Sequence, residues 1–251
     1  MIKGNILLIG GSGNLGQKII KSNLFGKIYH PKKNSLNLLK PDQIDKFLNL
    51  KKVDIIINCA SIARMKECEK NKSKAINNNI LGTFNLVSSI LKFNKNKRKN
   101  VLLVHISTDA VYPSIKGNYS EDSGLGPYNV YGWTKLSAEY LVKILEKHII
   151  IRTRFYDKKK IKYKFSASDI FTSQVDIRLL PKYIKYLILE KYSGVINIGG
   201  KRISDFNLYK KDNKKLKPFK RKNLIKKLKF TIAKDSSLNI KKFKKIKNKY
   251  E

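Results

Sequence analysis

Residues 5–16 read NILLIGGSGNLG, and this stretch decides the fold of the chain. Its unbroken apolar run is typical of a strand that is buried on both faces of a parallel sheet. Three glycines then recur at every third position before a helical pattern begins. In such a strand–turn–helix unit they permit a tight turn, the approach of a pyrophosphate to the backbone, and close helix–strand packing. We therefore predict a dinucleotide site, with a purely structural glycine turn as the alternative, made of Gly10, Gly13, Asn14, Leu15 and Gly16.

Apolar runs alternate with helical patterns along most of the chain. Strands are expected at residues 5–10, 27–30, 53–58, 101–106, 149–153 and 194–198. Helices are expected at residues 14–23, 41–50, 64–70, 75–93, 129–148 and 178–191. This alternation predicts an α/β fold, namely a Rossmann-like doubly wound parallel sheet with right-handed crossovers and a small C-terminal substrate-binding part.

The same patterns suggest three regions. Residues 1–155 are expected to form an NAD(P)-binding Rossmann-like domain, and residues 156–208 a reduced substrate-binding region interleaved with late elements of the sheet. Residues 209–251 are dominated by Lys and Asn. We interpret them as a lysine-rich C-terminal segment of mostly solvated charge, the alternative being a surface for an acidic partner or a membrane.

The net charge of the chain is +37, from 55 Lys and Arg residues against 18 Asp and Glu. Such a field would suit nucleic acid or an anionic membrane surface. However, only 7 of the basic residues are Arg, the side chain that nucleic-acid interfaces favour, and the lysines are spread along the whole chain. We therefore favour a coding bias toward lysine and expect no nucleic-acid partner, although anionic substrates would still be attracted.

Cysteine usage and hydrophobicity favour a cytoplasmic protein. The 2 cysteines, Cys59 and Cys68, leave no disulfide framework and suit a reducing compartment. The N-terminal apolar run is too short for a signal peptide or a membrane span. Neither cysteine has a partner at metal-ligand spacing and the 3 histidines do not cluster in the sequence, so no metal site is predicted.

The segment after the second expected strand bears on the choice of cofactor. A carboxylate usually ends this strand and binds the adenosine ribose. Here the segment reads His30-Pro31-Lys32-Lys33, without an acid. A cation at this position favours the 2′-phosphate of NADP, so NADP is preferred to NAD, with plain surface charge as the other interpretation of both lysines.

A tyrosine and a lysine lie one helical turn apart in the segment YGWTK at residues 131–135. The spacing of Tyr131 and Lys135 places the phenol and the ammonium on one face of the expected helix, although ordinary surface pairs share this spacing. The ammonium would favour phenolate and lower the pKa of the tyrosine toward that of a working general acid. Thr108 follows the fourth expected strand, at the sheet edge where ligands bind in open α/β folds. Its hydroxyl could hydrogen-bond a substrate carbonyl beside the tyrosine.

Five motifs follow one another as in extended short-chain dehydrogenases/reductases, and the chain resembles that superfamily. The motifs are the Gly10–Gly16 loop, NCAS at 58–61, NILGT at 79–83, STDAVY at 107–112 and PYNVYGWTK at 127–135. The chain is most similar to the dTDP-4-dehydrorhamnose reductase branch, because it also has the acidic pair Glu121-Asp122 and Ile-Arg-Thr at 151–153. The resemblance covers residues 1–155 well and residues 165–205 loosely.

The resemblance implies a role for each matching residue. Tyr131 would protonate the developing alkoxide and Thr108 would orient the substrate carbonyl. Lys135 would bind the nicotinamide ribose and lower the pKa of the tyrosine. Further residues of the cofactor cleft would be Asn58, Ala60, Ser61 and Asn79, the last of which could equally serve packing or a water relay.

The substrate region departs from the pattern of the branch. It is short, KKK at 158–160 replaces a more structured stretch, and a segment that often carries a Pro-Thr pair reads FTSQV at 171–175. Arg154 and Arg178 could bind the phosphates of a substrate, with surface or structural arginines as the alternative.

The resemblance implies an NAD(P)H-dependent reductase of a 4-keto-6-deoxy sugar nucleotide, which would serve surface polysaccharide synthesis and could form a homodimer. A sugar-nucleotide epimerase or dehydratase would share the same catalytic set, but dehydratases often place an acidic pair directly after the threonine, and here Asp109 is followed by Ala110. A non-catalytic, dinucleotide-binding regulatory protein is another candidate, although it has no need to keep all three catalytic side chains. The last candidate is a protein that binds nucleic acid or membrane surfaces through its positive charge.

Overall fold

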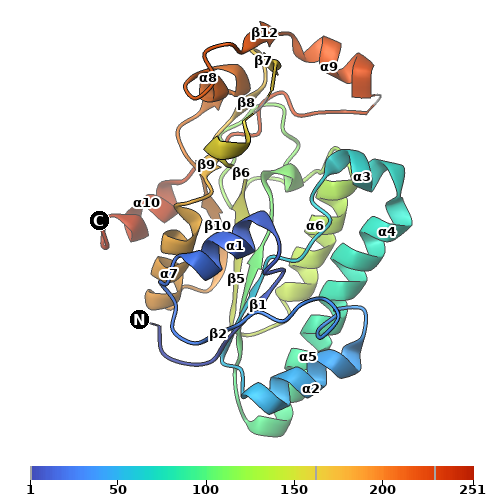
Figure 1. Cartoon of the computed structure of the whole chain (residues 1–251), viewed down its shortest axis with the longest axis vertical. Coiled ribbons are helices and arrows are strands. Elements are labelled where there is room, and N and C mark those ends of the chain that lie inside the picture. The colour runs from blue at the N-terminus through green and yellow to red at the C-terminus, as the bar shows by residue number, and fades with distance from the viewer. Residues whose placement is uncertain (1, 162, 229) are drawn as a thin grey trace.

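A six-stranded parallel sheet forms the centre of the computed structural model, which describes residues 2–161, 163–228 and 230–251 (Figure 1). Its strands are β1 (Ile6–Ile9), β2 (Ile28–Tyr29), β3 (Ile55–Asn58), β4 (Leu102–Ile106), β5 (His148–Thr153) and β10 (Gly194–Ile198). Their order across the sheet is β10-β5-β4-β3-β1-β2. Because β1 lies between β2 and β3, the chain winds outward from it in both directions, and the crevice at its C-terminal end is where ligands bind in such sheets. The predicted α/β class with a doubly wound parallel sheet is confirmed.

Helices cover both faces of the sheet, because its strands are apolar on both sides. The helices of one face are α1 (Asn14–Lys21), α7 (Leu180–Leu189) and α10 (Lys241–Lys247), and those of the other are α2 (Pro41–Lys51), α5 (Gly82–Lys97) and α6 (Val130–Val142). Successive side chains of β1 divide between them. Ile6 and Leu8 join the core beneath α1 and α7, and Leu7 and Ile9 join the core beneath α2 and α5.

Two helices, α5 and α6, end several residues away from the positions predicted from the sequence. α5 is preceded by α3 (Met65–Lys70), α4 (Lys72–Ile76) and a π-helical turn at Asn77–Leu81. It continues past the expected end at residue 93 until Arg98, whose φ of 45° closes it in the left-handed region. α6 stops at Val142 instead of residue 148, because the β-branched run that follows pairs with β4 as strand β5.

A second layer of short elements stands over the C-terminal edge of the sheet (Figure 1). It contains β6 (Phe155–Tyr156), β7 (Phe165–Ala167), β8 (Phe171–Thr172), β9 (Val175–Asp176), β11 (Ile203–Ser204), α8 (Asp205–Lys210), β12 (Lys217–Phe219) and α9 (Arg221–Leu228). The strands pair as β6–β9, β7–β12 and β8–β11, so residues far apart in the sequence form the layer together. Among the described residues, no helix is long and apolar enough to cross a membrane.

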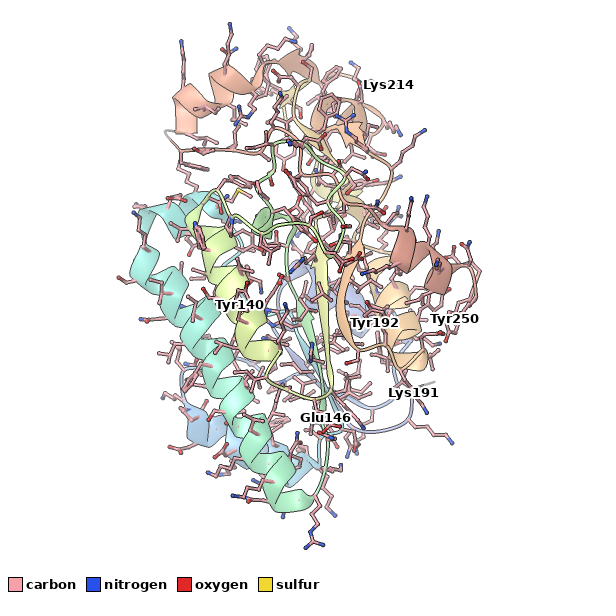
Figure 2. The ribbon with its side chains drawn as sticks, turned by 180° about the vertical axis from the view of Figure 1, so that it is seen from behind. Tyr140, Glu146, Lys191, Tyr192, Lys214 and Tyr250 are labelled. Carbon is pink, nitrogen blue, oxygen red and sulfur yellow. The ribbon has the colours of Figure 1, made fainter. Side chains whose placement is uncertain are left out.

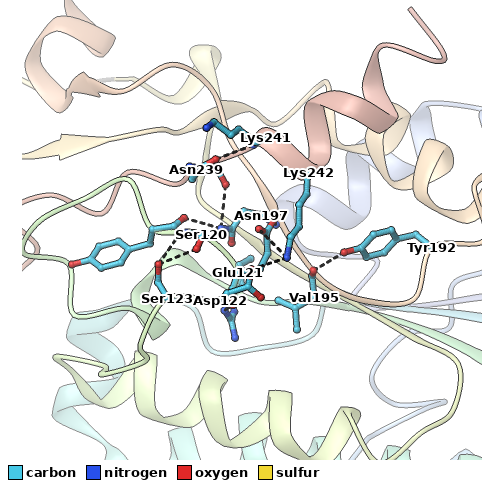
Figure 3. Close-up of polar contacts among 12 residues, drawn as sticks. Ser120, Glu121, Asp122, Ser123, Tyr192, Val195, Asn197, Asn239, Lys241 and Lys242 are labelled. Carbon is cyan, nitrogen blue, oxygen red and sulfur yellow. Dashed lines mark hydrogen bonds and ion pairs between the residues drawn. The ribbon is translucent and has the colours of Figure 1, made fainter.

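The C-terminal segment packs against the molecule through a few apolar side chains, while nearly all of its described lysines are exposed, so its charge is mostly solvated as predicted. Phe243 of α10 is 1% exposed, and its ring lies 4.8 Å from that of Tyr183 in α7. Figure 3 shows the polar contacts that hold the start of α10: Lys242 pairs with Asp122 at 3.0 Å, and the Asn197 amide donates to the Asn239 carbonyl. A short amphipathic helix can bury two apolar side chains while its lysines face the solvent.

A buried ion pair joins the sheet to α6. The Arg152 guanidinium on β5 donates to the Glu139 carboxylate at 2.7–3.2 Å, and both side chains are 1% exposed. The Ser107 hydroxyl at the end of β4 donates to the same carboxylate, and Arg152 also donates to the Tyr112 hydroxyl at 2.8 Å. Removing one partner of such a pair leaves a buried charge uncompensated, which is far more costly than losing a surface pair.

We expect Glu139→Gln to lower the free energy of unfolding by about 3–5 kcal/mol, because the Arg152 charge would stay buried without its counterion. The measurement is urea unfolding followed by circular dichroism. The matched control is Lys92→Met, which removes an exposed ion pair with Asp45 and should change stability much less. Equal losses in the two variants would contradict the structural role of the buried pair.

Candidate active site

The glycine turn between β1 and α1 is built from positions that accept no side chain. Gly10 has φ +80°, and a Cβ there would lie 2.7 Å from the backbone nitrogen of Ala60. A Cβ on Gly16 would lie 2.4 Å from the Gly10 carbonyl oxygen, because α1 packs directly onto the turn. These two glycines therefore shape the turn itself, as the sequence prediction held for a tight turn and close helix packing.

Gly13 differs from them because the space beside it is open. A Cβ built there meets only the Gly10 carbonyl oxygen within 4 Å, at 3.3 Å. It faces a cavity of about 710 Å³ between the glycine turn, the end of β2 and the segment after β3. α1 has no acidic residue in its first turn, so its N–H groups meet an anion without competing charge. The cavity and its glycine wall thus fit a dinucleotide.

The structure separates the predicted cofactor residues into three groups. Gly10, Gly13, Ala60 and Ser61 line the cavity. Leu15 is buried in the core beneath α1 and serves packing. Asn14 is exposed at the start of α1, where it accepts a hydrogen bond of 2.5 Å from the Lys160 ammonium. The lysine-rich turn at 158–160 therefore reaches the helix N-terminus, a contact that the sequence did not reveal.

Cations stand at the mouth of the cavity, where the sequence predicted them. His30, Lys32 and Lys33 follow β2 and belong to the cavity lining, and all three are exposed. An adenosine ribose bound across the turn would meet positive charge here and no carboxylate from β2. This arrangement suits the 2′-phosphate of NADP.

Thr108 and Tyr131 come together at the C-terminal end of β4. α6 starts after Asn129, whose side chain accepts a hydrogen bond of 2.7 Å from the Gly132 N–H, and this cap places Tyr131 in the first turn. Burial raises the pKa of Tyr131, and a hydrogen bond with the Thr108 hydroxyl partly offsets that rise. The sequence predicted a pKa lowered by Lys135. The direction is the opposite, because the phenol is buried and the ammonium is directed elsewhere.

Lys135 is directed toward β4 and is fully buried. Its Nζ lies 2.8 Å from Nε2 of His105, in the middle of that strand. Burial lowers the pKa of Lys135 to about 8, and the Glu139 carboxylate one turn further along α6 acts in the opposite direction. The lysine is therefore close to losing its charge at neutral to mildly alkaline pH. His105 was missed at the sequence level, where the only signal was a histidine inside an otherwise apolar strand.

Asn79 joins the cavity wall to α6. Its side chain donates to the Ile62 carbonyl at 3.1 Å and to the Thr134 hydroxyl at 2.9 Å, and it accepts from the Ile62 N–H at 2.8 Å. It lies in the π-helical turn between α4 and α5, a distortion that is frequent at functional sites. All of its polar atoms are used within the protein, which favours the packing role among those considered for it.

Comparison with known proteins identifies the family. Residues 4–168, more than half of the chain, match the model of the RmlD substrate binding domain. The chain belongs to this family. The resemblance to extended short-chain dehydrogenases/reductases of the dTDP-4-dehydrorhamnose reductase branch is thereby confirmed.

Individual relatives of the family agree with this placement. A dTDP-4-dehydrorhamnose reductase from Aggregatibacter actinomycetemcomitans is 29% identical over 153 residues, 59% of this chain and 50% of the relative. The chain thus spans half or less of the curated relatives it matches first. The structure of a hypothetical dTDP-4-dehydrorhamnose reductase from Sulfolobus tokodaii superposes with a TM-score of 0.83 at 26% identity, covering 96% of this chain and 94% of that one. The structure of the Bacillus anthracis dTDP-4-dehydrorhamnose reductase in complex with NADP superposes with a TM-score of 0.87 at 22% identity, covering 97% of this chain and 92% of that one. It shares the fold.

Each of the two arginines expected near the substrate has a carboxylate partner of its own in this RmlD-family chain. Arg178 is held by Asp176 at 2.6 Å, on an exposed turn before α7. Arg154 lies closer to the site: burial lowers its pKa, but Asp205 and Asp109 more than offset this and raise it. Its guanidinium is 3.6 Å from Asp205, and its side chain is 30% exposed. Their contact with the phosphates of a substrate stays a prediction.

Metal ligands are not gathered anywhere in the described part of the chain. No group of three or more His, Cys, Asp or Glu side chains there could hold a metal ion. Both cysteines are free, and burial raises the pKa of Cys59 to about 12 and that of Cys68 to about 11. Both therefore stay as thiols at neutral pH.

We expect Gly13→Val to abolish dinucleotide binding while leaving the fold intact, because the new side chain would occupy the open cavity and meet only one backbone atom. The readout is fluorescence titration with NADPH, together with the thermal unfolding midpoint. Gly124→Val is the matched control, since no atom lies within 4 Å of a Cβ there, and it should bind NADPH normally. Undiminished binding by Gly13→Val would show that the cofactor does not lie against this turn.

Proposed function

We propose that the protein reduces the keto group of a 4-keto-6-deoxy sugar nucleotide with NADPH or NADH, in the manner of a dTDP-4-dehydrorhamnose reductase serving surface polysaccharide synthesis. The observation that carries the proposal is the meeting of Thr108 and Tyr131 at the sheet edge, with Lys135 one helical turn further along α6 and the dinucleotide cavity beside them. The similarity to reductases of that name supports the choice of substrate class.

The chain's own residues would position the substrate and deliver the proton. Bound NAD(P)H would supply the hydride to the carbonyl carbon. Tyr131, whose raised pKa keeps the phenol protonated, would give its proton to the carbonyl oxygen. Thr108 would hydrogen-bond the same oxygen, and Lys135 would hold the nicotinamide ribose. The product is the alcohol, with one hydride on carbon and one proton on oxygen.

NADP is the cofactor we favour over NAD. The cations at the end of β2 support it, and so does the NADP bound in the Bacillus anthracis structure. The remaining cofactor contacts are assigned to the glycine turn and to Ala60 and Ser61, with Asn58 and Asn79 acting from below and beside the cavity.

The sugar nucleotide is assigned to the C-terminal edge of the sheet, which the second layer covers, with residues 156–208 as the substrate-binding region. A dehydratase would be expected to carry a second acid directly after Asp109. Here that position is Ala110, which is buried against Tyr131 and offers no carboxylate, so the dehydratase alternative is not favoured. A regulatory protein would bind the dinucleotide without turnover, and the assay below separates the two. The free cysteines and the sugar-nucleotide substrate both support a cytoplasmic location.

A homodimer is proposed through the outer faces of α5 and α6. Phe84 and Leu91 lie two turns apart on α5, and Trp133 and Tyr140 lie two turns apart on α6; all four are 43–57% exposed. Tyr140 lies on the outer side of its helix (Figure 2). Exposed apolar residues gathered in this way are typical of protein interfaces.

We expect the protein to sediment as a dimer in sedimentation velocity at micromolar concentration. A variant in which both Leu91 and Trp133 are replaced by charged residues should sediment as a monomer.

The first test is NADPH or NADH oxidation followed at the nicotinamide absorbance band, with dTDP-4-dehydrorhamnose added to the purified protein. We expect substrate-dependent oxidation, faster or tighter with NADPH. Binding of the dinucleotide without oxidation would favour another sugar nucleotide or the regulatory alternative. Failure to bind either dinucleotide would overturn the proposed function altogether.

Tyr131→Phe should lower kcat by about 10²–10⁴-fold, the usual contribution of a general acid, and leave the affinity for NADPH nearly unchanged. The control is Tyr250→Phe, which alters a hydroxyl at the far edge of the molecule (Figure 2) and should keep full activity. A Tyr131→Phe variant that retains wild-type kcat would exclude the phenol as proton donor.

A further inference from the structure

His105 is a buried titratable side chain to which the proposed mechanism gives no role. It lies in the middle of β4, is 0% exposed, and has Asn58 of β3 on one side and Lys135 of α6 on the other. Burial and the neighbouring Lys135 both lower its pKa well below the usual 6.5. The imidazole is therefore neutral at physiological pH, with a proton on one ring nitrogen and a lone pair on the other.

The neighbours of the ring decide which nitrogen carries the proton. The Ala60 N–H donates to Oδ1 of Asn58 at 3.1 Å, which fixes the orientation of that amide. Its Nδ2 then faces Nδ1 of His105 at 3.4 Å. Because an amide nitrogen only donates, this contact favours a lone pair on Nδ1 and the proton on Nε2. Nε2, however, faces Nζ of Lys135 at 2.8 Å, so the charge of the lysine also acts on the choice.

This orientation has a consequence for the lysine. An ammonium has three donors and no acceptor, so it meets the Nε2–H donor unfavourably, whereas a neutral amine accepts from it. To accommodate the ammonium, the imidazole must move its proton to Nδ1, and the contact with Asn58 is then lost. The charge of Lys135 is thus coupled through one ring to a backbone amide in the wall of the cofactor cavity.

The other groups around Lys135 are few. Glu139 follows one turn later on α6 and favours the ammonium, but its carboxylate is engaged by Arg152 of β5 and Ser107 of β4. From the segment after β3 comes the Cys59 thiol, which is protonated. Tyr131 lies one turn earlier on the same helix. His105 is the group in direct hydrogen-bonding contact with Nζ.

We propose that His105 is a positioning residue of the reductase, whose Nε2 holds the Lys135 side chain beneath the cofactor cavity, accepting from the ammonium and donating to the neutral amine, and whose Nδ1 links it through Asn58 to the Ala60 backbone. The inference rests on the proposed role of Lys135. It assigns His105 no contact with substrate or cofactor. Dinucleotide binding against Ala60 and the protonation of Lys135 become linked events, so each depends on the other.

The alkaline limb of the pH–rate profile reports this coupling. Burial holds the pKa of Tyr131 above its usual value, so Lys135, with a pKa of about 8, is the first of the two to lose its proton. His105→Gln offers a carbonyl oxygen to the ammonium and should move the limb of kcat/KM up by about 1 pH unit. His105→Leu removes the partner in an apolar interior and should move it down by a similar amount. His148→Asn, on the surface side of β5, should leave the limb in place.

The same shift can be measured without a sugar substrate. Lys135 is also assigned to the nicotinamide ribose, so the affinity for NADPH should change as this lysine loses its proton. In titrations from pH 6 to 10, the pH of that change should move up in His105→Gln and down in His105→Leu. A loss of kcat or affinity at every pH, with the limb unmoved in both variants, would mean that His105 only fills space and would overturn the proposal.

The ring itself gives the decisive readout. The chain has 3 histidines, so ¹⁵N-histidine labelling with His30→Asn and His148→Asn variants assigns every imidazole signal. We expect a neutral His105 ring from pH 5 to 9 that changes from the Nδ1–H to the Nε2–H tautomer as Lys135 loses its proton near pH 8, and that keeps the Nε2–H tautomer throughout in Lys135→Met. A single tautomer over this range in the wild-type protein, or protonation of the ring near pH 6.5, would overturn the inference. These spectra require no turnover, so they separate its failure from a failure of the proposed reductase activity.

Discussion

The ion pair between Arg152 and Glu139 fixes how helix α6, which carries Tyr131 and Lys135, lies on the sheet. Glu139 stands one turn after Lys135 and two turns after Tyr131, so the three side chains share one face of α6. A buried carboxylate separated from its guanidinium costs several kcal/mol, which leaves α6 a single favourable rotation about its axis. The direction in which the phenol and the ammonium point is thus set by a residue that takes no part in chemistry.

The same helix face meets a matching row of polar groups on β4. His105 and Ser107 are two residues apart on the strand and therefore point to the same side, where they bond Lys135 and Glu139 respectively. The interface between β4 and α6 is a polar seam inside an otherwise apolar core. Each member is satisfied by another, as buried polar groups must be, and the seam ends at the sheet edge where Thr108 and Tyr131 meet.

What the sequence predicted correctly is local in origin. Apolar runs mark the six strands of the central sheet, the glycine spacing marks the turn, and the i, i+4 pair of Tyr131 and Lys135 needs only one helix. His105 was missed because its partners lie 30 and 47 residues away, and no local pattern records such pairing. The place where the C-terminal helix docks was not predicted, because Phe243 and Ile246 are outnumbered by lysines, yet two apolar side chains suffice to dock a short helix. The ion pair of Arg178 could have been predicted from the sequence, since its partner Asp176 lies only two residues earlier.

The positions of the charges also indicate how an anionic substrate would be drawn to this site. Arg154 interacts with Asp109, the residue after Thr108, but Asp109 and Asp205 compensate its charge, so it adds little net attraction there. The net charge of +37 belongs mainly to exposed lysines. Field effects of this kind speed the encounter between protein and ligand but fall steeply with ionic strength, and they distinguish one anion poorly from another. Selectivity for the proposed sugar nucleotide would therefore come from the shape and hydrogen bonds of the second layer, where β7, β8 and β12 bring together residues from both ends of the C-terminal half.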